Sequence, residues 1–199
     1  MTPLRQTERS AVRRHPERGS DERALAHAIL DEALVCHLGY VHDGAPVVIP
    51  TAFVRVGDEL IVHGAPGGRA LRALAAGSTV CCTVTLTDGL VLARSAMHHS
   101  MNYRAVVAFG AARAITDPDE KRAVLHALVE KIHPGRSAVA RPPDAQELAA
   151  TAVLAIPLDE ASVKVREGGP LDRADDLTWP CDAGVIPLTL QRGAFFPMG

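Results

Sequence analysis

Two short segments combine the residue types that hold an anionic ligand. Residues 67–72 read Gly-Gly-Arg-Ala-Leu-Arg, so that glycines precede a short helix carrying two arginines three residues apart. Amide groups at the start of a helix and arginine side chains both bind phosphate. The same residues would also suit an ordinary turn followed by two solvated arginines. Taken alone, this segment leaves anion binding and a plain turn equally open.

The second segment, residues 97–104, reads Met-His-His-Ser-Met-Asn-Tyr-Arg and lies between two apolar runs. It contains Asn102, the only asparagine of the chain. Polar side chains at this density favour a ligand-facing surface, and a loop with a hydrogen-bonded histidine pair is the alternative. His98 and His99 diverge on extended backbone, and no Cys or His spacing typical of zinc is present. We therefore predict no metal site.

A third segment, residues 46–53, reads Pro-Val-Val-Ile-Pro-Thr-Ala-Phe. Pro50 lacks the amide hydrogen that a central strand needs, so it indicates a bulge or an edge strand. The small residues Thr51 and Ala52 would let backbone groups meet the rim of a flat ring such as a flavin. An edge strand without a ligand is the alternative.

The elements that must position these segments are strands joined by tight turns. Asp43-Gly44, Gly57-Asp58 and Asp88-Gly89 each separate apolar runs, which is the strongest short-range signal for a hairpin. We predict strands at 34–41, 46–56, 59–63, 79–87, 90–96, 103–115 and 152–165.

Helices are predicted between some of these strands. Ser20 or Asp21 would cap a helix that ends near residue 33, and residues 67–77 form a short helix closed by Gly77. Asp117 with Glu120 and Asp144 with Glu147 have capping-box spacing for two later helices. The longer of these has a predicted buried stripe of Val124, Leu125, Leu128, Val129 and Ile132.

About six or seven antiparallel strands with few helices predict an α+β, mainly β, barrel or sandwich. A Rossmann fold is excluded, because no crossover helices separate the strands. We expect three segments: an N-terminal arm at residues 1–20, a barrel domain at 21–165, and an extended tail at 166–199 that packs on the domain or on a partner subunit.

Composition excludes several classes of protein. The 199 residues are 47% hydrophobic and 22% charged, with a net charge of −2, so no basic field attracts nucleic acid or an anionic membrane. No apolar run is long enough to span a bilayer, and residues 1–18 lack the apolar core of a secretory signal. We expect a cytoplasmic protein whose four cysteines are reduced.

Several short stretches together resemble one known family, the pyridoxamine 5′-phosphate oxidase-like flavin-nucleotide-binding proteins, whose relatives include nitroimidazole-resistance proteins. The resemblance runs over most of the chain, from Arg14 to Leu188. The stretches that carry it are Pro16-Glu17-Arg18-Gly19, Pro46-Val47-Val48-Ile49-Pro50-Thr51, His63-Gly64, Asp88-Gly89-Leu90-Val91-Leu92-Ala93-Arg94-Ser95, His99-Ser100-Met101-Asn102-Tyr103-Arg104, Pro134-Gly135-Arg136, Lys164-Val165-Arg166-Glu167-Gly168-Gly169-Pro170 and Gly184-Val185-Ile186-Pro187-Leu188.

The resemblance implies an FMN-binding split β-barrel and a homodimer with flavin at the subunit interface; FAD is the alternative cofactor. It implies that residues from all three segments bind the cofactor. The ring would lie against Ile49, Pro50, Thr51 and Ala52. The phosphate end would be held by His63, Gly64, Gly68, Arg69 and Arg72. Ser100, Asn102, Tyr103 and Arg104 would complete the pocket, and Lys164 and Arg166 would reach the flavin of either subunit.

This chain also departs from the family pattern. Asp182 stands where a tryptophan is expected before Ala183-Gly184, Ala105 where a serine is expected, and Ser137 where an aromatic residue is expected. Loss of the tryptophan would open the pocket or weaken flavin binding without affecting the fold.

The resulting hypothesis is a flavin-dependent oxidoreductase that passes electrons from NAD(P)H to a small-molecule acceptor. The flavin would carry the redox step, and the protein would bind and orient it. His63 and His99 are the candidate catalytic residues, although each also suits a cofactor or packing contact. The alternatives are a non-catalytic flavin- or haem-binding sensor or carrier, and a protein that uses deazaflavin or haem in place of flavin.

Overall fold

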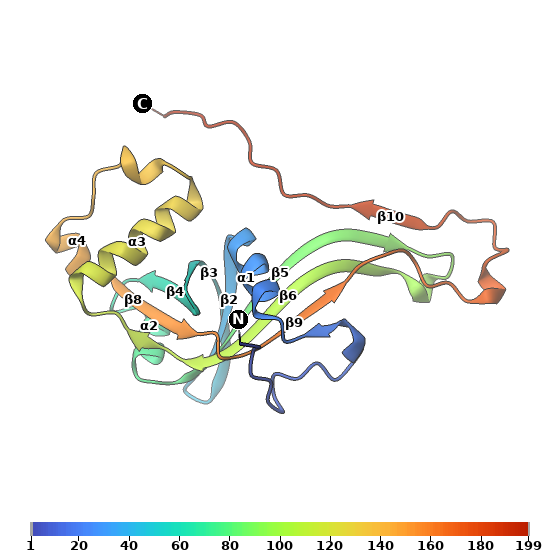
Figure 1. Cartoon of the computed structure of the whole chain (residues 1–199), viewed down its shortest axis with the longest axis horizontal. Coiled ribbons are helices and arrows are strands. Elements are labelled where there is room, and N and C mark those ends of the chain that lie inside the picture. Colours follow the sequence, from blue (N-terminus) through green and yellow to red (C-terminus); the bar gives the residue numbers. More distant parts are fainter. Residues whose placement is uncertain (1, 199) are drawn as a thin grey trace. The chain divides into compact units, whose positions relative to one another are not determined.

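The computed structural model describes residues 2–198 and has the α+β, mainly antiparallel fold that the sequence predicts (Figure 1). The strands follow the order β1-β9-β6-β5-β2-β3-β4-β8-β7, with β10 beside β5. Within the described residues the two ends of this path, β1 and β7, do not pair, so the sheet is open.

The strands are β1 (Gly19–Ser20), β2 (Val35–His42), β3 (Ala45–Val56), β4 (Glu59–Gly64), β5 (Thr79–Leu92), β6 (Ser100–Ala111), β7 (Arg113–Ala114), β8 (Ala152–Pro157), β9 (Glu160–Arg166) and β10 (Gly184–Pro187). The helices are α1 (Arg23–Glu32), α2 (Arg69–Ala75), α3 (Pro118–Ile132) and α4 (Ala145–Ala149), with short 3₁₀ turns at Pro16–Arg18, Ala96–His98, Arg136–Ala138 and Ala174–Asp176. None of the helices in the described part of the chain is long and apolar enough to cross a membrane.

The chain divides into two compact units, which we describe one at a time. The first comprises Met1–Thr85 with Ala105–Lys164, and the second comprises Leu86–Arg104 with Val165–Gly199. The predicted boundaries of arm, barrel and tail stay predictions.

The first unit is built on tight antiparallel hairpins. Asp43 and Gly44 have φ values of 49° and 77°, as a two-residue turn with both central residues in the left-handed region requires. This turn joins β2 to β3, and Gly57, at φ 58°, lies in the turn from β3 to β4. β4 then pairs with β8, and β8 with β7. The predicted hairpins at Asp43-Gly44 and Gly57-Asp58 are confirmed.

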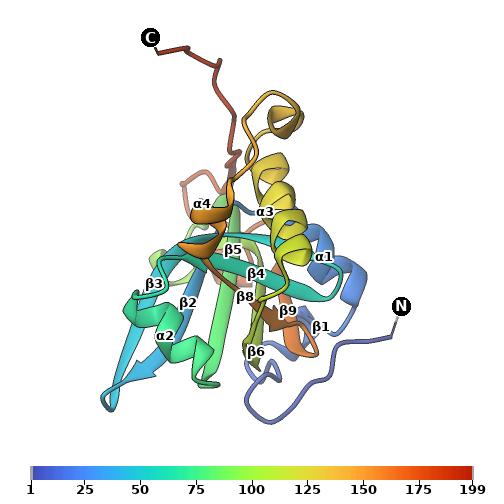
Figure 2. The same ribbon diagram turned by 90° about the vertical axis from the view of Figure 1, so that its left-hand side faces the viewer.

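Helix α3 covers one face of this unit (Figure 2). Its Val124 and Leu128 pack with Val54, Ile61 and other residues of β3, β4 and β8 into a core cluster. Asp117 caps the helix, since its side chain accepts the amides of Asp119 and Glu120 at 3.1 and 2.8 Å. The cap is as predicted.

Two other capping predictions were wrong. The Glu120 side chain accepts a bond from Arg113 at 2.7 Å and does not close a capping box. At α1, the residue before the helix is Glu22, which has no side-chain cap, and the Ser20 hydroxyl accepts the amide of Glu22 at 3.0 Å. The box that joins Asp144 and Glu147 at α4 is confirmed.

Two predicted long strands are each divided. Residues 152–165 form β8 and β9, because the chain turns after Pro157, and the amide of Leu158 bonds to the carbonyl of Asp58 at 2.9 Å. The strand predicted at 103–115 begins earlier, at Ser100, and continues after Ala111 as the short β7.

Residues 2–20 pack along β9 in the first unit. Arg5 forms a parallel bridge with Glu160, and β1 pairs with Lys164 and Val163. Leu4 and Ser10 of this segment are only 3% and 4% exposed. The segment therefore contributes to the core of the unit.

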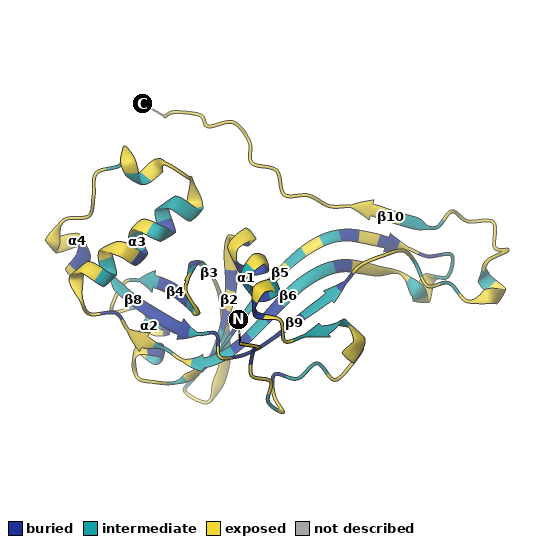
Figure 3. Ribbon diagram, in the orientation of Figure 1, coloured by how far each residue is buried: buried dark blue, intermediate teal, exposed yellow. Residues whose placement is uncertain are grey.

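The second unit corrects the third predicted hairpin. Asp88 and Gly89 lie inside the continuous strand β5, and Gly89 is not among the glycines with positive φ. A Cβ atom at Gly89 would meet Val185 at 3.0 Å and the Ile186 carbonyl at 3.1 Å. Glycine is present here because β10 approaches closely, and a turn was the wrong interpretation. Beyond β10, residues 188–198 are exposed throughout (Figure 3).

Candidate functional site

The first unit brings two of the predicted ligand segments to one end of a hairpin. Phe53 pairs with Val62 in the register of β3 and β4, so Ala52 and His63 follow directly on the neighbouring strands. α2 begins four residues beyond β4, after a turn in which the amide of Gly68 bonds to the carbonyl of Ala65 at 2.9 Å. The ring-facing and phosphate-facing residues predicted in this unit are therefore local neighbours.

Glycine leaves room for the Leu71 side chain where β4 meets α2. A Cβ atom at Gly64 would stand 3.2 Å from the Leu71 side chain, which is tighter than ordinary contact. The helix that follows exposes both Arg69 and Arg72 to solvent. Among the described residues neither has an ion-pair partner, so both guanidinium groups are available to an anion.

The residues expected to line the ring lie on β3. Ile49, Pro50, Thr51 and Ala52 pair with β2, and of the four only Pro50 is exposed. Thr51 makes a long hydrogen bond, 3.3 Å, to the carbonyl of Ala52. The structure thus shows a paired strand with half-buried small side chains, and the role of these residues toward a ring stays a prediction.

In the second unit Asn102 and Arg166 form one buried network. They are 9% and 6% exposed, and Arg166 donates a short hydrogen bond to the Asn102 side chain. Arg166 also donates to the carbonyls of Gly168 and Gly169, each at 3.0 Å, and Asn102 donates to Gly168 at 3.1 Å. Among the described residues every partner of Arg166 is neutral.

The other polar residues predicted here have different surroundings. Arg104 forms two bonds to the carboxylate of Asp88, at 3.0 and 2.8 Å. Tyr103 is half-buried and Ser100 is exposed. His99 is exposed and one ring nitrogen contacts the carbonyl of Ser95 at 3.1 Å. The catalytic and the packing role of His99 both stay predictions.

Lys164 lies in the first unit, where it holds the N-terminal segment. Its ammonium group donates to the carbonyl of Arg14 at 2.8 Å. The neighbouring Glu160 is 5% exposed and accepts two bonds from Arg9, each at 2.7 Å. The hydrogen bonds from Arg9 and Thr7 lower the pKa of Glu160 to about 2.

Sequence reasoning missed a cavity of about 810 Å³ in the first unit. It lies along α3, α4 and the loop between them, and its walls include Leu125, Val129 and Ile132. These three side chains were predicted in the buried stripe of α3, yet Leu125 and Val129 are only half-buried and Ile132 is 56% exposed. The available signal was the width of the predicted apolar stripe, which is wider than the contact of α3 with the core requires.

His63 lines this cavity as well. Its Nδ1 atom is buried and has no hydrogen-bond partner among the described residues. A buried nitrogen without a partner is costly, which makes it a candidate for a ligand bond. His126 of α3 also lines the cavity but is exposed.

The far wall of the cavity is held by a charged residue of α3. Glu130 accepts the amides of Gly135 and Ser137 at 2.7 and 2.9 Å, together with a short bond from the Ser137 hydroxyl. These bonds lower the pKa of Glu130 to about 2. Glu130 is therefore ionised at neutral pH and accepts all three bonds from the loop after α3.

No group of three or more His, Cys, Asp or Glu side chains that could hold a metal ion gathers within residues 2–198. Lys131, on the core side of α3, places its ammonium group 3.5 Å from the centre of the Phe53 ring. Burial lowers the pKa of Lys131 to about 8.

Comparison with solved structures finds close relatives over nearly the whole chain. The flavocytochrome Anf3 from Azotobacter vinelandii is 39% identical, with a TM-score of 0.90, over 96% of this chain and 89% of that one. A FAD and heme binding protein from Mycobacterium smegmatis is 41% identical, with a TM-score of 0.87, over 91% and 89% of the two chains.

A more distant structure shares the fold alone. A putative 5-nitroimidazole antibiotic resistance protein from Bacteroides thetaiotaomicron is 24% identical, with a TM-score of 0.63, over 74% of this chain and 86% of that one. The search of curated proteins finds no match.

A family model described as pyridoxamine 5′-phosphate oxidase matches residues 22–165. That span includes the β3–β4 hairpin, α2 and the strands up to β9, so it covers the framework on which the predicted ligand segments lie. The chain therefore belongs to the pyridoxamine 5′-phosphate oxidase family.

Proposed function

We propose that this chain is a redox protein that binds both a flavin and haem. The two relatives at 39% and 41% identity are described as a flavocytochrome and as a FAD and heme binding protein. Their likeness extends over more than nine-tenths of this chain. The observation that carries the proposal is the apolar cavity along α3. His63 lines this cavity, and its buried Nδ1 atom has no hydrogen-bond partner among the described residues.

The cavity suits haem in size and chemistry. Its volume of about 810 Å³ falls within the range of roughly 300–1,000 Å³ that is typical of cofactor pockets. Leu125, Val129 and Ile132 would contact an apolar macrocycle, and histidine is the commonest protein ligand of haem iron. Arg122 and Arg141 line the same cavity and pair with Asp119 and Glu147. Both pairs are exposed, so the arginines would exchange these partners for the propionate groups. In this proposal His63 is the iron ligand, and this role replaces the one predicted for it at the phosphate end of the flavin.

The flavin is assigned to the β3–β4–α2 segment of the first unit. Arg69 and Arg72 have no ion pair among the described residues, so a phosphate group would give them a counter-charge. The small, half-buried side chains of Thr51 and Ala52 would leave space for the flavin ring beside the backbone of β3. The comparison with the mycobacterial FAD and heme binding protein supports FAD over FMN.

The protein's own contribution is to bind and orient these groups. A flavin supplies a two-electron redox centre and haem a one-electron centre when bound. Apolar side chains of α3 would keep water from the His63 cavity, and Glu130 would hold the wall that closes it. We retain the hypothesis that electrons pass from NAD(P)H to a small-molecule acceptor. Anaerobic mixing with NADH or NADPH tests this step, and a flavin that stays oxidised with both donors would contradict it.

Arg69→Ala tests the flavin assignment. Loss of a charge-assisted bond should weaken FAD or FMN binding by about 1.5–3 kcal/mol. Arg173→Ala is the matched control, since Arg173 is an exposed arginine outside the segment and outside the stretches that carry the family resemblance. Equal affinity of Arg69→Ala and the native chain for both flavins would remove Arg69 from the site.

We also propose a homodimer with each flavin near the subunit interface. The second unit exposes an apolar ribbon face made of Leu90, Leu92, Ile186 and Leu188, which are 37%, 38%, 48% and 38% exposed. Leu90 pairs directly with Ile186, so these side chains share one face. Such a face in a chain of this size supports a protein partner, and a second copy fits the family resemblance.

His63→Ala tests the haem assignment, with His126→Ala as a matched control from the same cavity. The native chain and His126→Ala should bind added haem with the sharp absorption band of a histidine-ligated iron. His63→Ala should lose that band and should recover it when imidazole is added. Loss of the band in His126→Ala alone would contradict the assignment of His63.

A further inference from the structure

The N-terminal segment, residues 2–20, carries a charge opposite to that of the rest of the chain. It contains five arginines, two glutamates and no lysine or aspartate, which gives it a formal charge of +3. The whole chain is at −2, so the remaining residues together carry −5. Beneath the segment, Lys164 and Glu160 of β9 add one charge of each sign. The segment is therefore a basic surface on an acidic protein.

This basic surface has a fixed backbone. Leu4 and Ser10 are buried, and β1 at the end of the segment pairs with β9. Between them, the Lys164 ammonium donates to the carbonyl of Arg14 at 2.8 Å. Chain termini are poorly ordered unless they are tied down in this way. The arginines of the segment therefore start from defined backbone positions.

The arginine side chains are accessible to a partner. Those of Arg9 and Arg13 are 51% and 70% exposed. Arg9 bonds to Glu160, and Arg13 pairs with Glu8, whose side chain is 92% exposed. Arg14 is exposed and forms no ion pair within residues 2–198. Exposed pairs contribute little, so Arg13 and Arg14 are both free to meet another anionic group.

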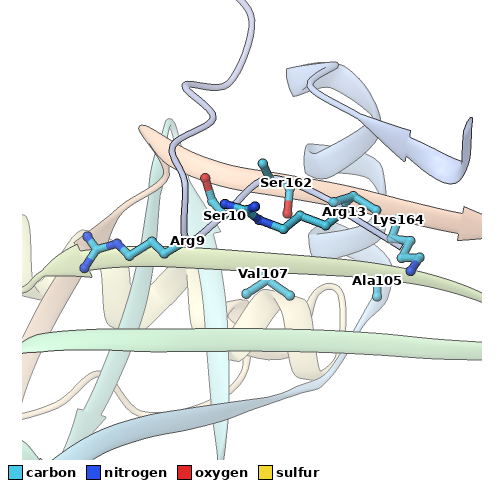
Figure 4. Close-up of a pocket in the computed structure, with 9 residues that line it drawn as sticks. Arg9, Ser10, Arg13, Ala105, Val107, Ser162 and Lys164 are labelled. Carbon is cyan, nitrogen blue, oxygen red and sulfur yellow. The ribbon is translucent and has the colours of Figure 1, made fainter. Parts of the chain in front are cut away.

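The cations are spread out and do not converge on one point. Figure 4 shows the Arg9 guanidinium extending away from Arg13 and Lys164. The Arg13 guanidinium and the Lys164 ammonium lie at opposite ends of the small cavity that these side chains line. A small anion would meet one of these groups at a time, whereas a broad acidic surface can meet several. The arrangement therefore fits a macromolecule with spaced carboxylates.

The size of the segment fits a transient protein partner. A stable interface takes about 20–30 residues from each side, and brief encounters between redox proteins bury the least surface. Residues 2–20 fall at the lower end of that range. A long polyanion such as DNA, or an anionic membrane, would extend past the segment and meet the −5 of the remaining chain. A compact acidic protein can contact the segment alone.

We infer that residues 2–20 form the docking surface for a small acidic electron-carrier protein. The acidic character of the partner follows from the charges of the segment, whereas the choice of an electron carrier rests on the redox function proposed above. Opposite charges speed diffusional encounter and orient the partners. Such steering suits a carrier that must bind and leave at every turnover.

The probe is an acidic plant-type ferredoxin, and its association with the purified full-length chain and its cofactors is followed by surface plasmon resonance. The association rate constant should fall steeply as salt is added. Arg14→Glu should lower it by about fivefold or more at low ionic strength, and Glu8→Gln, which removes an exposed negative charge, should raise it.

Arg173→Glu is the matched control. It makes the same change of net charge as Arg14→Glu at an exposed arginine of the second unit, and it should leave the association rate constant close to that of the native chain. Rapid mixing with reduced ferredoxin then tests the choice of carrier. One electron should pass from each ferredoxin to the loaded chain, and Arg14→Glu should slow this transfer by the same factor as association.

Four results would overturn the inference in whole or in part. Equal slowing by Arg14→Glu and Arg173→Glu would mean that net charge alone matters. Absence of ferredoxin binding, with binding to a short DNA duplex or to vesicles of equal parts phosphatidylglycerol and phosphatidylcholine, would replace the acidic protein with a nucleic acid or a membrane. Weaker self-association of Arg14→Glu would assign the segment to a second copy. Binding without electron transfer would remove the electron carrier.

The failure of the proposed redox function has a different signature. A chain that takes up neither flavin nor haem, yet binds ferredoxin with the predicted order of the variants, would contradict the redox function and the choice of an electron carrier. The same result would support residues 2–20 as a docking surface for an acidic protein.

Discussion

The two units of the chain use their apolar residues in opposite ways. In the first unit Phe53, Leu60 and Leu154 are at most 2% exposed, and the cluster beneath α3 is closed by further aliphatic side chains. In the second unit Trp179, Phe195 and Phe196 are 65%, 74% and 80% exposed. It has few buried apolar side chains, such as Val91 and Ala93, together with polar pairs such as Arg94 with Asp172 at 2.8 and 2.9 Å.

This contrast separates the apolar side chains that pack against others within the chain from those that stay exposed. The first unit buries its large apolar side chains against one another, which is the usual source of stability in a domain. The second unit has polar networks inside and aromatic groups outside. Trp179, Phe195 and Phe196 are exposed in the single chain, so the proposed second copy could bury them.

The largest effect should come from removing a phenylalanine ring in the first unit. Phe53→Ala should lower the free energy of unfolding by about 3–5 kcal/mol, because it leaves a cavity in a closed core. Phe196→Ala is the control, since its ring is 80% exposed, and it should leave that free energy almost unchanged in dilute protein. Urea unfolding followed by circular dichroism measures both. Similar losses in the two variants would break the contrast between the units.

The tail of the second unit provides the converse test. Replacing Phe195 and Phe196 with serine should weaken self-association, because each ring that is buried in a dimer contributes about 1.5–3 kcal/mol. Light scattering over a range of concentrations measures the dissociation constant. An unchanged dimer would show that the tail lies outside the interface, and a native chain that stays monomeric would contradict the dimer itself.

A smaller loss of stability is expected from the polar network of the second unit. Asn102→Ala should cost about 1–3 kcal/mol, because it removes a partner from the buried Arg166. Ser100→Ala, at an exposed position on the same strand, is the control and should be nearly neutral. If Asn102→Ala is also neutral, the network does not stabilise this unit.

The smallest effect concerns the N-terminal segment and pH. The pKa of Glu160 in the folded chain is about 2, against roughly 4.3 when unfolded. A lowered pKa means that this carboxylate stabilises the fold above pH 4.3 and that the contribution is lost as the pH falls toward 2. The protection factors of amides in residues 2–20, which correct for the intrinsic pH dependence of hydrogen exchange, should therefore fall over that interval.

Glu160→Gln should show these lowered protection factors already at neutral pH, and Glu8→Gln, at an exposed carboxylate, should not. Identical exchange profiles in Glu160→Gln and in the native chain would contradict a role for Glu160 in holding the segment.

Local sequence signals predicted part of this fold. They failed where contacts between residues distant in the sequence determine the local structure. Asp43-Gly44 and Asp88-Gly89 are the same dipeptide, but only the first forms a turn. At the second, the close approach of β10 requires glycine, and Asp88 pairs with Arg104. No local pattern shows that residues 184–187 return to this strand.

The same reasoning applies to the candidate site. The β3–β4–α2 segment could be predicted because its glycines, proline and arginines are adjacent in sequence. The His63 cavity could not, since it depends on how far α3 and the loop after it stand from β4.

The absorption spectrum of the purified chain, with mass analysis of the ligands that it releases, tests the proposal of two cofactors most directly. We predict a flavin and haem from the same protein, each near one equivalent per chain. A colourless protein that binds neither added flavin nor added haem would contradict it.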